Sequence, residues 1–250
     1  MIIYGINPVL EALHQGRVRR VRIGPRSDRR VEEALAIARQ RGVTIERADP
    51  NTIDRLARGG VHQGIVADVD EPRDYSLRDL VESAAPAAPL LVVLDGIEDP
   101  HNVGAILRTV DAAGAHGVVR QARHSATLDG VAAKASAGAV ALVRIATEVN
   151  IARAIEELKG LNVWTIGLAG DAADRYDEID FMLPTAIVLG AEGAGLRRLV
   201  RDRCDRLVSI PMHGTVESLN VSVAAGVVLF EAARQREKGQ GTRNKGKGKD

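Results

Sequence analysis

Residues 210–231 read IPMHGTVESLNVSVAAGVVLFE, and this stretch decides how the rest of the chain is interpreted. An apolar segment ends at Pro211, a polar loop carries Ser218 and Asn220, and an apolar helix follows directly. Serine and asparagine are favoured at helix entrances, where unpaired backbone N–H groups point outward. The helix contains the run Ala-Ala-Gly at 224–226, and an internal glycine lowers helix stability by about 1 kcal/mol relative to alanine. The stretch therefore predicts a functional loop and a helix that another backbone approaches closely.

The whole chain has the composition of a soluble globular protein. It has 250 residues, of which 45% are hydrophobic and 27% charged, enough for one large domain or two ordinary ones. The sequence contains no run of about 18 apolar residues and no charged-then-apolar leader, so we expect a cytoplasmic protein without a membrane span. Cys204 is the single cysteine, which excludes an internal disulfide, and we expect it to be a small core residue. The six histidines lack metal-ligand spacing, so we expect no metal.

Basic residues are concentrated in two regions. Residues 17–30 carry seven arginines against one aspartate, and this density favours contact with nucleic-acid phosphates over a merely solvated strand. The residues assigned to this contact are Arg17, Arg19, Arg20, Arg22 and Arg26. The last fifteen residues carry six basic and two acidic side chains in a context rich in glycine and lysine. For this tail, a disordered solubilising extension and nucleic-acid contact remain equal alternatives.

The first 74 residues alternate short strands and helices, which predicts a small α/β domain. We expect Asn7 to cap its first helix, with Pro8 at the first helical position. Prolines, charges and alanines follow, and this composition is typical of a linker. The predicted organisation is an N-terminal domain at 1–74, a linker at 75–89, a second domain at 90–237 and a basic disordered tail at 238–250.

The second domain opens with LLVVL at 90–94, a continuous apolar run typical of a parallel strand that is buried on both faces. A helix at 102–113 follows, and βα units then repeat, including a strand expected at 140–146. Alternating strands and helices predict a parallel sheet covered by helices on both sides. Ligands of such sheets collect beyond the carboxyl ends of the strands. Three loops follow strands in this way, namely 95–102, 190–195 and 211–220.

Charged and glycine residues in and beside these loops suggest a site, although each also has a plainer explanation. GAEGAG at 190–195 resembles a dinucleotide fingerprint, but its glycine spacing and its place late in the chain argue against a nicotinamide enzyme. Glu192 and Glu217 could form an acid and base pair, or one of them could cap a helix. Arg108 lies off the apolar stripe of its helix, four residues after Gly104, and is either functional or an ordinary surface arginine.

Three segments resemble the motifs of a known family. These are DGIEDPHNVGAILRT at 95–109, VLGAEGAG at 188–195, and IPM with SLNVS within 210–222. In this order they resemble motifs 1, 2 and 3 of the SpoU (TrmH-like) RNA ribose 2′-O-methyltransferases. The segments YGINPVLEA at 4–12 and HQGI at 62–65 look like the substrate-binding domain of the branch that modifies a guanosine of 23S ribosomal RNA.

The resemblance implies a trefoil-knotted α/β methyltransferase domain that binds S-adenosylmethionine and works as a homodimer, with the active site at the subunit interface. It implies a small N-terminal α/β domain that binds the RNA substrate. By motif match, the catalytic set is Arg108, Asn102, Glu192, Ser218 and Asn220. The cofactor would be held by Gly190, Ile210, Leu219, Leu189, Met212 and Asn220.

The implied reaction is attack of a ribose 2′-oxygen on the sulfonium methyl group. The family counterpart of Arg108 is proposed as the base, but a guanidinium is effectively always protonated in proteins. Holding a phosphate and stabilising the charge on the oxygen is chemically easier for Arg108. Three alternatives stay open at this point: a transfer-RNA methyltransferase of the same family, a noncatalytic RNA-binding or ribosome-assembly factor, and a nucleotide-dependent oxidoreductase.

Overall fold

The computed structural model describes residues 1–25, 29–70, 74–128 and 130–246. The chain forms two compact units. The first comprises Met1–Pro72, Asp99–Arg108 and Ala126–Leu142, and the second comprises Arg73–Glu98, Thr109–Ser125 and Val143–Asp250. Helix α5 (Pro100–Ala112) contributes residues to both units. Within the described residues, no helix has the length and apolar character needed to cross a membrane.

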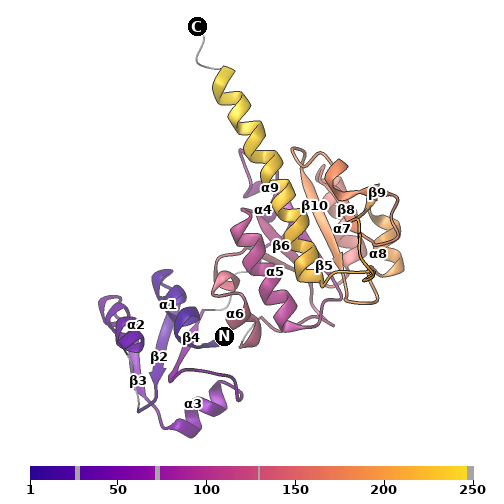
Figure 1. Ribbon diagram of the computed structural model, residues 1–250. Helices are drawn as coiled ribbons and strands as arrows, with labels where there is room; N and C mark the ends of the chain where they lie inside the picture. The colour runs from indigo at the N-terminus through magenta and orange to yellow at the C-terminus, as the bar shows by residue number, and fades with distance from the viewer. Residues whose placement is uncertain (26–28, 71–73, 129, 247–250) are drawn as a thin grey trace. The chain divides into compact units, whose positions relative to one another are not determined.

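The first unit contains a four-stranded sheet in the order β1-β4-β2-β3, of which β4, β2 and β3 are labelled in Figure 1. Its strands are β1 (Ile2–Tyr4), β2 (Val18–Ile23), β3 (Thr44–Arg47) and β4 (Ile65–Val69). Strand β4 is antiparallel to β1 and β2, while β2 and β3 are parallel. The helices of its N-terminal part are α1 (Ile6–His14), α2 (Arg29–Gln40) and α3 (Pro50–Leu56). The predicted strand and helix alternation is therefore correct, and β1 is an additional strand.

Helix α1 begins one residue before Asn7, so the prediction that Asn7 caps it is wrong. The N-cap is Gly5, whose φ of 92° is open to glycine at little steric cost. The Ile6 N–H, one of the first-turn donors that have no partner within the helix, donates to Gln63 Oε1 at 3.1 Å. The acceptor thus comes from a residue 57 positions away, which a local capping pattern does not contain.

A helix, α4 (Leu77–Glu82), lies within the segment expected to be a linker. Ser76 and Asp79 form a capping box, in which the Asp79 N–H donates to Ser76 Oγ at 3.1 Å and the Ser76 N–H donates to Asp79 Oδ2 at 2.9 Å. Leu77 and Leu80 are buried in the core of the second unit. This part of the segment is therefore folded into the second unit, because a capped turn presents two leucines to the core.

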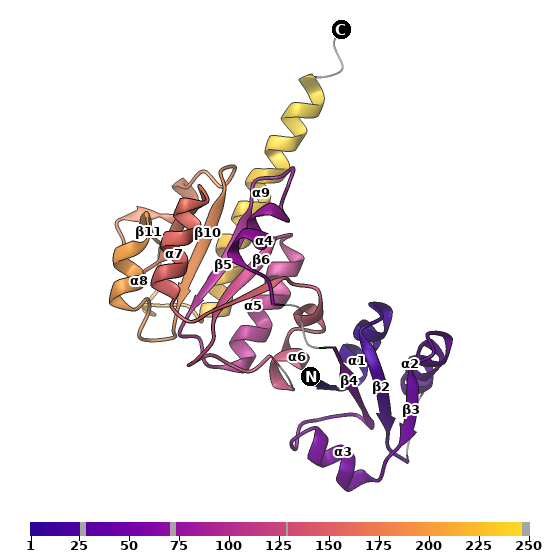
Figure 2. The same ribbon diagram turned by 180° about the vertical axis from the view of Figure 1, so that it is seen from behind.

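The second unit is built on a seven-stranded sheet in the order β7-β6-β5-β10-β8-β11-β9, and every adjacent pair of strands is parallel. Figure 2 shows α7 (Ile151–Gly160) and α8 (Arg198–Arg203) on one face, and Figure 1 shows α9 (Val221–Gly246) on the other. The predicted parallel α/β sheet is confirmed. Its strands are β5 (Leu90–Asp95), β6 (Gly117–Gln121), β7 (Ile145–Glu148), β8 (Trp164–Leu168), β9 (Asp174–Arg175), β10 (Thr185–Gly190) and β11 (Arg206–Ser209).

The single strand expected at 140–146 is wrong. A short 3-10 helix, η1 (Ala139–Ala141), occupies its first part, and β7 begins only at Ile145. Gly138 precedes η1 with a φ of 99°, a conformation that breaks an extended chain. The apolar run is therefore divided between a turn and a strand, which periodicity alone does not separate.

The spacing of four residues suggests that Gly104 clears the face of α5 that carries Arg108, but the missing side chain serves a neighbouring helix instead. A Cβ atom on Gly104 would lie 2.5 Å from Ala135 Cβ and 2.7 Å from the Ala132 carbonyl oxygen. Both of these belong to α6 (Val131–Ala135), so the glycine allows α6 to approach α5. The face of Gly104 is occupied by a helix and is not cleared for Arg108, which is itself exposed.

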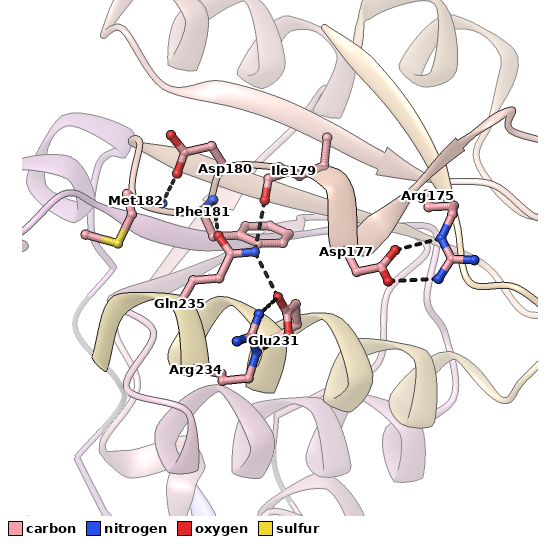
Figure 3. Close-up of polar contacts among 9 residues, drawn as sticks. All are labelled: Arg175, Asp177, Ile179, Asp180, Phe181, Met182, Glu231, Arg234 and Gln235. Atoms are coloured by element: carbon pink, nitrogen blue, oxygen red, sulfur yellow. Dashed lines mark hydrogen bonds and ion pairs between the residues drawn. The ribbon is translucent and has the colours of Figure 1, made fainter. Parts of the chain in front are cut away.

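Helix α9 is tied to the segment before β10 by two side chains. As Figure 3 shows, Gln235 accepts a hydrogen bond from the Phe181 N–H at 2.9 Å and donates to the Ile179 carbonyl at 3.0 Å. The Arg236 guanidinium donates to main-chain carbonyls, including Ala88 at 2.6 Å and Pro89 at 3.1 Å. The helix continues to Gly246, so residues 238–246, which the sequence predicts to be disordered, are helical.

His116 is expected to make the stability of the second unit depend on pH in the acid range. Its Nδ1 accepts from the Leu90 N–H at 3.0 Å, and burial together with the nearby Arg236 cation lowers the pKa of its imidazole below 6.5. The unfolded chain therefore binds a proton more readily, so this contribution to stability is intact above pH 6.5 and is lost as the pH falls below it. We expect the urea midpoint to fall between pH 7.5 and pH 5.5, and to fall less in His116→Gln. Equal decreases in both proteins would contradict this assignment.

Candidate active site

A cavity of about 240 Å³ opens at the carboxyl ends of three adjacent strands, β10, β8 and β11, and at the start of α9. Parallel sheets bind ligands at this edge because several strand ends meet there. The lining includes five of the residues assigned to the cofactor, namely Leu189, Gly190, Ile210, Met212 and Leu219. Asn220, the sixth, is not part of the described lining but directly follows it in sequence.

The end of β8 supplies cavity residues that the sequence analysis missed. Leu168, Ala169 and Gly170 line the cavity, whereas no residue of the described loop 95–102 does. Strand β8 lies between β10 and β11 in the sheet, although it precedes both in the chain. The signal available in the sequence was an apolar strand followed by a glycine, comparable to the glycine that ends β10 and the proline that follows β11.

The loop after β10 is compact. The Ala191 N–H donates to the Gly195 carbonyl at 3.1 Å, and the Gly195 N–H donates to the Ala191 carbonyl at 2.8 Å. Gly193 and Gly195 have φ values of 75° and 67°, which glycine adopts at little cost. A Cβ atom on Gly190 would lie 2.2 Å from the Gly195 carbonyl carbon, so this position has room only for glycine. The glycines of GAEGAG therefore build a closed loop that forms one wall of the cavity.

Asn220 joins this loop to α9. Its side-chain oxygen accepts from the Ser222 N–H at 2.9 Å, which caps α9, and its amide nitrogen donates to Glu192 Oε1 at 2.9 Å. The predicted helix-entrance role of Asn220 is confirmed. Ser218 and Glu217 also line the cavity, and Ser218 is exposed. The structure thus brings Glu192, Ser218 and Asn220 together.

The other two residues of the expected catalytic set lie on α5. Asn102 is buried, with 7% of its surface exposed, and Arg108 is exposed on the same helix. Both belong to the first unit, whereas Glu192, Ser218 and Asn220 belong to the second. Assembly of all five into one centre is accordingly a proposal.

The close backbone approach expected at Gly226 of α9 is absent within the described part of the chain. The nearest heavy atom to a Cβ placed there is Thr109 Cγ2, at an ordinary contact distance of 3.9 Å. Helix α9 instead carries two apolar faces. Ala225, Val228 and Leu229 are fully buried, whereas Val223 is 51% and Phe230 is 53% exposed. A helix that is apolar on both sides is usually covered on both sides.

The arginines of β2 pair with acidic residues on the neighbouring strands. Arg22, whose side chain is 17% exposed, contacts Asp68 at 2.9 Å and Glu46 at 3.2 Å, and the hydrogen bond with Asp68 raises its pKa. Arg20 contacts Glu46 at 3.2 Å, and Arg19 pairs with Asp70. Arg17 donates to the main-chain carbonyls of residues 141 and 70, and Arg26 lies outside the described residues.

Cys204 has the environment of a core residue, as the sequence predicts. Its Sγ lies 3.3 Å from the Val200 carbonyl, and burial raises the pKa of the thiol to about 12. The reactive form of cysteine is the thiolate, which is scarce at neutral pH for such a group. Cys204 therefore has a packing role in the second unit.

Two family models match different parts of the chain. Residues 89–230 match the model of the SpoU rRNA Methylase family, and residues 2–75 match the model described as RNA 2′-O ribose methyltransferase substrate binding. The 23S rRNA (guanosine-2′-O-)-methyltransferase RlmB of Yersinia pestis is 45% identical over 94% of this chain and 97% of its own length. An uncharacterized tRNA/rRNA methyltransferase of Mycolicibacterium gilvum is 46% identical over 94% of this chain and 76% of its own length.

Solved structures agree with these sequence matches. The SpoU methyltransferase AviRb of Streptomyces viridochromogenes, solved in complex with AdoMet, superposes with a TM-score of 0.80 at 27% identity, over 95% of this chain and 91% of that one. An AdoMet-bound rRNA methyltransferase of Sinorhizobium meliloti gives a TM-score of 0.75 at 27% identity, over 93% and 86% of the two chains. On the strength of both family models and these relatives, the chain belongs to the SpoU rRNA methylase family.

Proposed function

We propose that this protein methylates the ribose 2′-hydroxyl of a guanosine in 23S ribosomal RNA, with S-adenosylmethionine as the methyl donor, in the cytoplasm. The observation that carries the proposal is the cavity beyond β10, β8 and β11, because five residues assigned to the cofactor from the family motifs line it together. The relative from Yersinia pestis is named for that activity, and its alignment with this chain covers 97% of its length.

The cavity residues fit S-adenosylmethionine chemically. The walls contributed by Leu189, Ile210 and Leu219 are apolar, as an adenine ring requires, and glycine positions in the two loops leave backbone groups accessible. Backbone N–H and C=O groups can fix the orientation of the adenosine and methionine parts. The bound cofactor supplies an electrophilic methyl group. The protein's part is to hold this group and the ribose oxygen in line, which accounts for much of the rate in such reactions.

Five side chains are assigned to the reacting ribose. Arg108 would hold the adjacent phosphate and stabilise negative charge on the 2′-oxygen, because its guanidinium stays protonated. Asn220 caps α9 and bonds to Glu192, so it holds the first turn of that helix in place. Ser218 would contact the RNA beside this turn. Through its bond, Glu192 would hold Asn220 in place. Asn102 enters the set by its place in the first family motif.

Transfer of tritium from labelled S-adenosylmethionine to RNA transcripts tests the proposal. A 23S ribosomal RNA transcript is expected to be labelled at one guanosine, and the label should make the following phosphodiester resistant to alkali. A transfer-RNA transcript serves as the second substrate, because the Mycolicibacterium gilvum relative carries the name tRNA/rRNA methyltransferase. Labelling of transfer RNA alone would contradict ribosomal RNA as the substrate and identify the protein as a transfer-RNA methyltransferase. If the protein binds the cofactor normally but labels no RNA, the enzyme proposal fails and the alternative of a noncatalytic RNA-binding factor is favoured.

We also propose that the protein is a homodimer and that its methyltransferase unit has the trefoil knot of its family. The dimer is supported by the exposed apolar face of α9, defined by Val223 and Phe230, and by the half-buried Gly226 between them. A second copy would cover this face, and the small residue would allow the two helices to approach. Stable interfaces bury about 1,200–2,000 Å² in total, which requires such apolar patches.

The double variant Val223→Glu/Phe230→Glu is expected to be monomeric, because two carboxylates would be buried without partners in the interface. Light scattering coupled to size exclusion measures the mass directly. Glu237→Gln, an exposed change on the same helix, is the matched control and should stay dimeric. A dimeric double variant with wild-type stability would remove α9 from the interface.

The β2 arginines are expected to divide into two classes. Arg19→Gln should weaken RNA binding and reduce the slope of log affinity against log salt by about 1, because its side chain is 74% exposed and can exchange Asp70 for a phosphate. Arg22→Gln should mainly lower the melting temperature, because it leaves Asp68 and Glu46 without their partly buried cation. Filter binding at several salt concentrations and thermal melts separate the two. An unchanged slope in Arg19→Gln would move the RNA contact elsewhere.

A further inference from the structure

A buried carboxylate lies beneath the cavity loop and has no role in the mechanism above. Asp95, the last residue of β5, is fully buried, and it is in register with Gly190, where the loop begins. A buried carboxylate lowers the stability of a fold unless donors satisfy its oxygens. The source of its donors therefore indicates which part of the molecule the carboxylate holds.

Arg197, at the far end of the same loop, supplies these donors. Its backbone N–H donates to Asp95 Oδ2 at 2.8 Å, and its Nε donates to Asp95 Oδ1 at 2.6 Å. Its Nη2 also pairs with Asp95 and donates to Gln121 Oε1 at 2.8 Å. Gln121 is the last residue of β6 and is 8% exposed. One arginine thus fastens the residue before α8 to the ends of β5 and β6.

The loop 190–196 is held at both ends by these contacts. Its first residue, Gly190, is part of β10 and packs against the backbone of Gly195, and the residue after it, Arg197, is bonded to Asp95. Between them, Glu192 reaches Asn220 at 2.9 Å. The contact between Asp95 and Arg197 therefore helps to set the position of the cavity wall. It also helps to set the position of Glu192, whose carboxylate bonds to Asn220, the cap of α9.

We propose that Asp95 and Arg197 form a clasp that positions loop 190–196 to receive S-adenosylmethionine. The clasp rests on the proposed function of the cavity. Arg197 is a positioning residue, since the contacts described here direct its guanidinium toward Asp95 and Gln121. Lysine does not replace it, because an ammonium group lacks the planar fork that contacts Asp95 and Gln121 together.

Full-length Arg197→Lys and Asp95→Asn test the clasp. Each is expected to raise the dissociation constant and KM for S-adenosylmethionine about ten- to hundredfold, the loss expected for a hydrogen bond to a charged group. kcat at saturating cofactor should change little, since lost ground-state binding appears in KM. Backbone amides of 191–196 should exchange with deuterium faster in the free variants. Arg198→Lys is the matched control, because Arg198 is adjacent, its side chain is 93% exposed and it pairs with Asp202 on its own helix.

Wild-type cofactor affinity and wild-type exchange of 191–196 in both variants would overturn the clasp, even if their melting temperatures were lower. Arg197→Lys keeps the backbone bond to Asp95, so it decides the question if Asp95→Asn does not fold. If the wild-type protein itself binds no S-adenosylmethionine, the proposed function fails. The deuterium exchange comparison, which contains no cofactor, then still reports whether Arg197 fixes the loop.

Discussion

Arg108→Ala is expected to bind S-adenosylmethionine as the wild-type protein does and to methylate RNA about a hundred- to a thousandfold more slowly, the usual loss for one donor that stabilises a developing oxyanion. Arg108 is exposed on α5 and is not part of the described lining of the cofactor cavity, so its removal should leave cofactor affinity unchanged. Single-turnover tritium transfer with saturating RNA measures the chemical step, and calorimetric titration measures cofactor binding.

Arg108→Lys separates the positive charge of this side chain from its planar, bidentate shape. A lysine retains the positive charge without the bidentate fork, so partial activity is expected if charge stabilisation is the main role. Near-wild-type transfer by Arg108→Ala would assign the role to another residue.

Gly190→Ala is expected to have the second large effect, a loss of cofactor binding together with about 3 kcal/mol of stability, near the upper end for overpacking. The new methyl carbon would lie 2.2 Å from the Gly195 carbonyl carbon and 2.3 Å from the Leu196 nitrogen. These are backbone atoms, so the loop itself must move. A displaced loop no longer forms the cavity wall, and its movement would strain the bonds between Arg197 and Asp95.

Gly214→Ala is the matched control for this change. Gly214 lies in the neighbouring loop, and an added Cβ there meets no heavy atom within 4 Å. Cofactor titration and thermal melting should give wild-type values for Gly214→Ala and a large loss for Gly190→Ala. If the Gly190 variant binds S-adenosylmethionine normally, the loop is more adaptable than its packing indicates, and the clasp would also lose its purpose.

The part of the site that follows from the sequence is the part that local pattern controls. Apolar runs that end in glycine or proline mark strand ends, and strand ends of a parallel sheet meet at one edge. By this rule, the loops that contain Gly190 and Leu219 are expected to lie near one another. In the structure, the Asn220 side chain joins them by its bond to Glu192, which is 28 residues away in the sequence. The same rule applied to β8 would also have identified Gly170.

The contacts that the sequence did not reveal are those made between distant segments. Arg197 is 102 residues from Asp95, and Gln63 is 57 residues from Ile6, so no periodicity or capping pattern contains either pair. The arginines of 17–22 illustrate a related difficulty. Their density in the sequence indicates a basic surface, but Asp68 and Glu46 on adjacent strands neutralise Arg22 in the folded sheet. Charge in one strand has to be judged together with the charge of its neighbours.

The attachment of α9 to the start of the sheet has a consequence for the order of events during synthesis. Arg236 reaches back 148 residues to the Ala88 carbonyl, and Gln235 holds the segment at Phe181 and Ile179. A nascent chain that has already released all seven strands from the ribosomal tunnel still lacks the donors for these carbonyls and the apolar cover that α9 provides. We therefore expect the methyltransferase unit to finish folding only after α9 emerges.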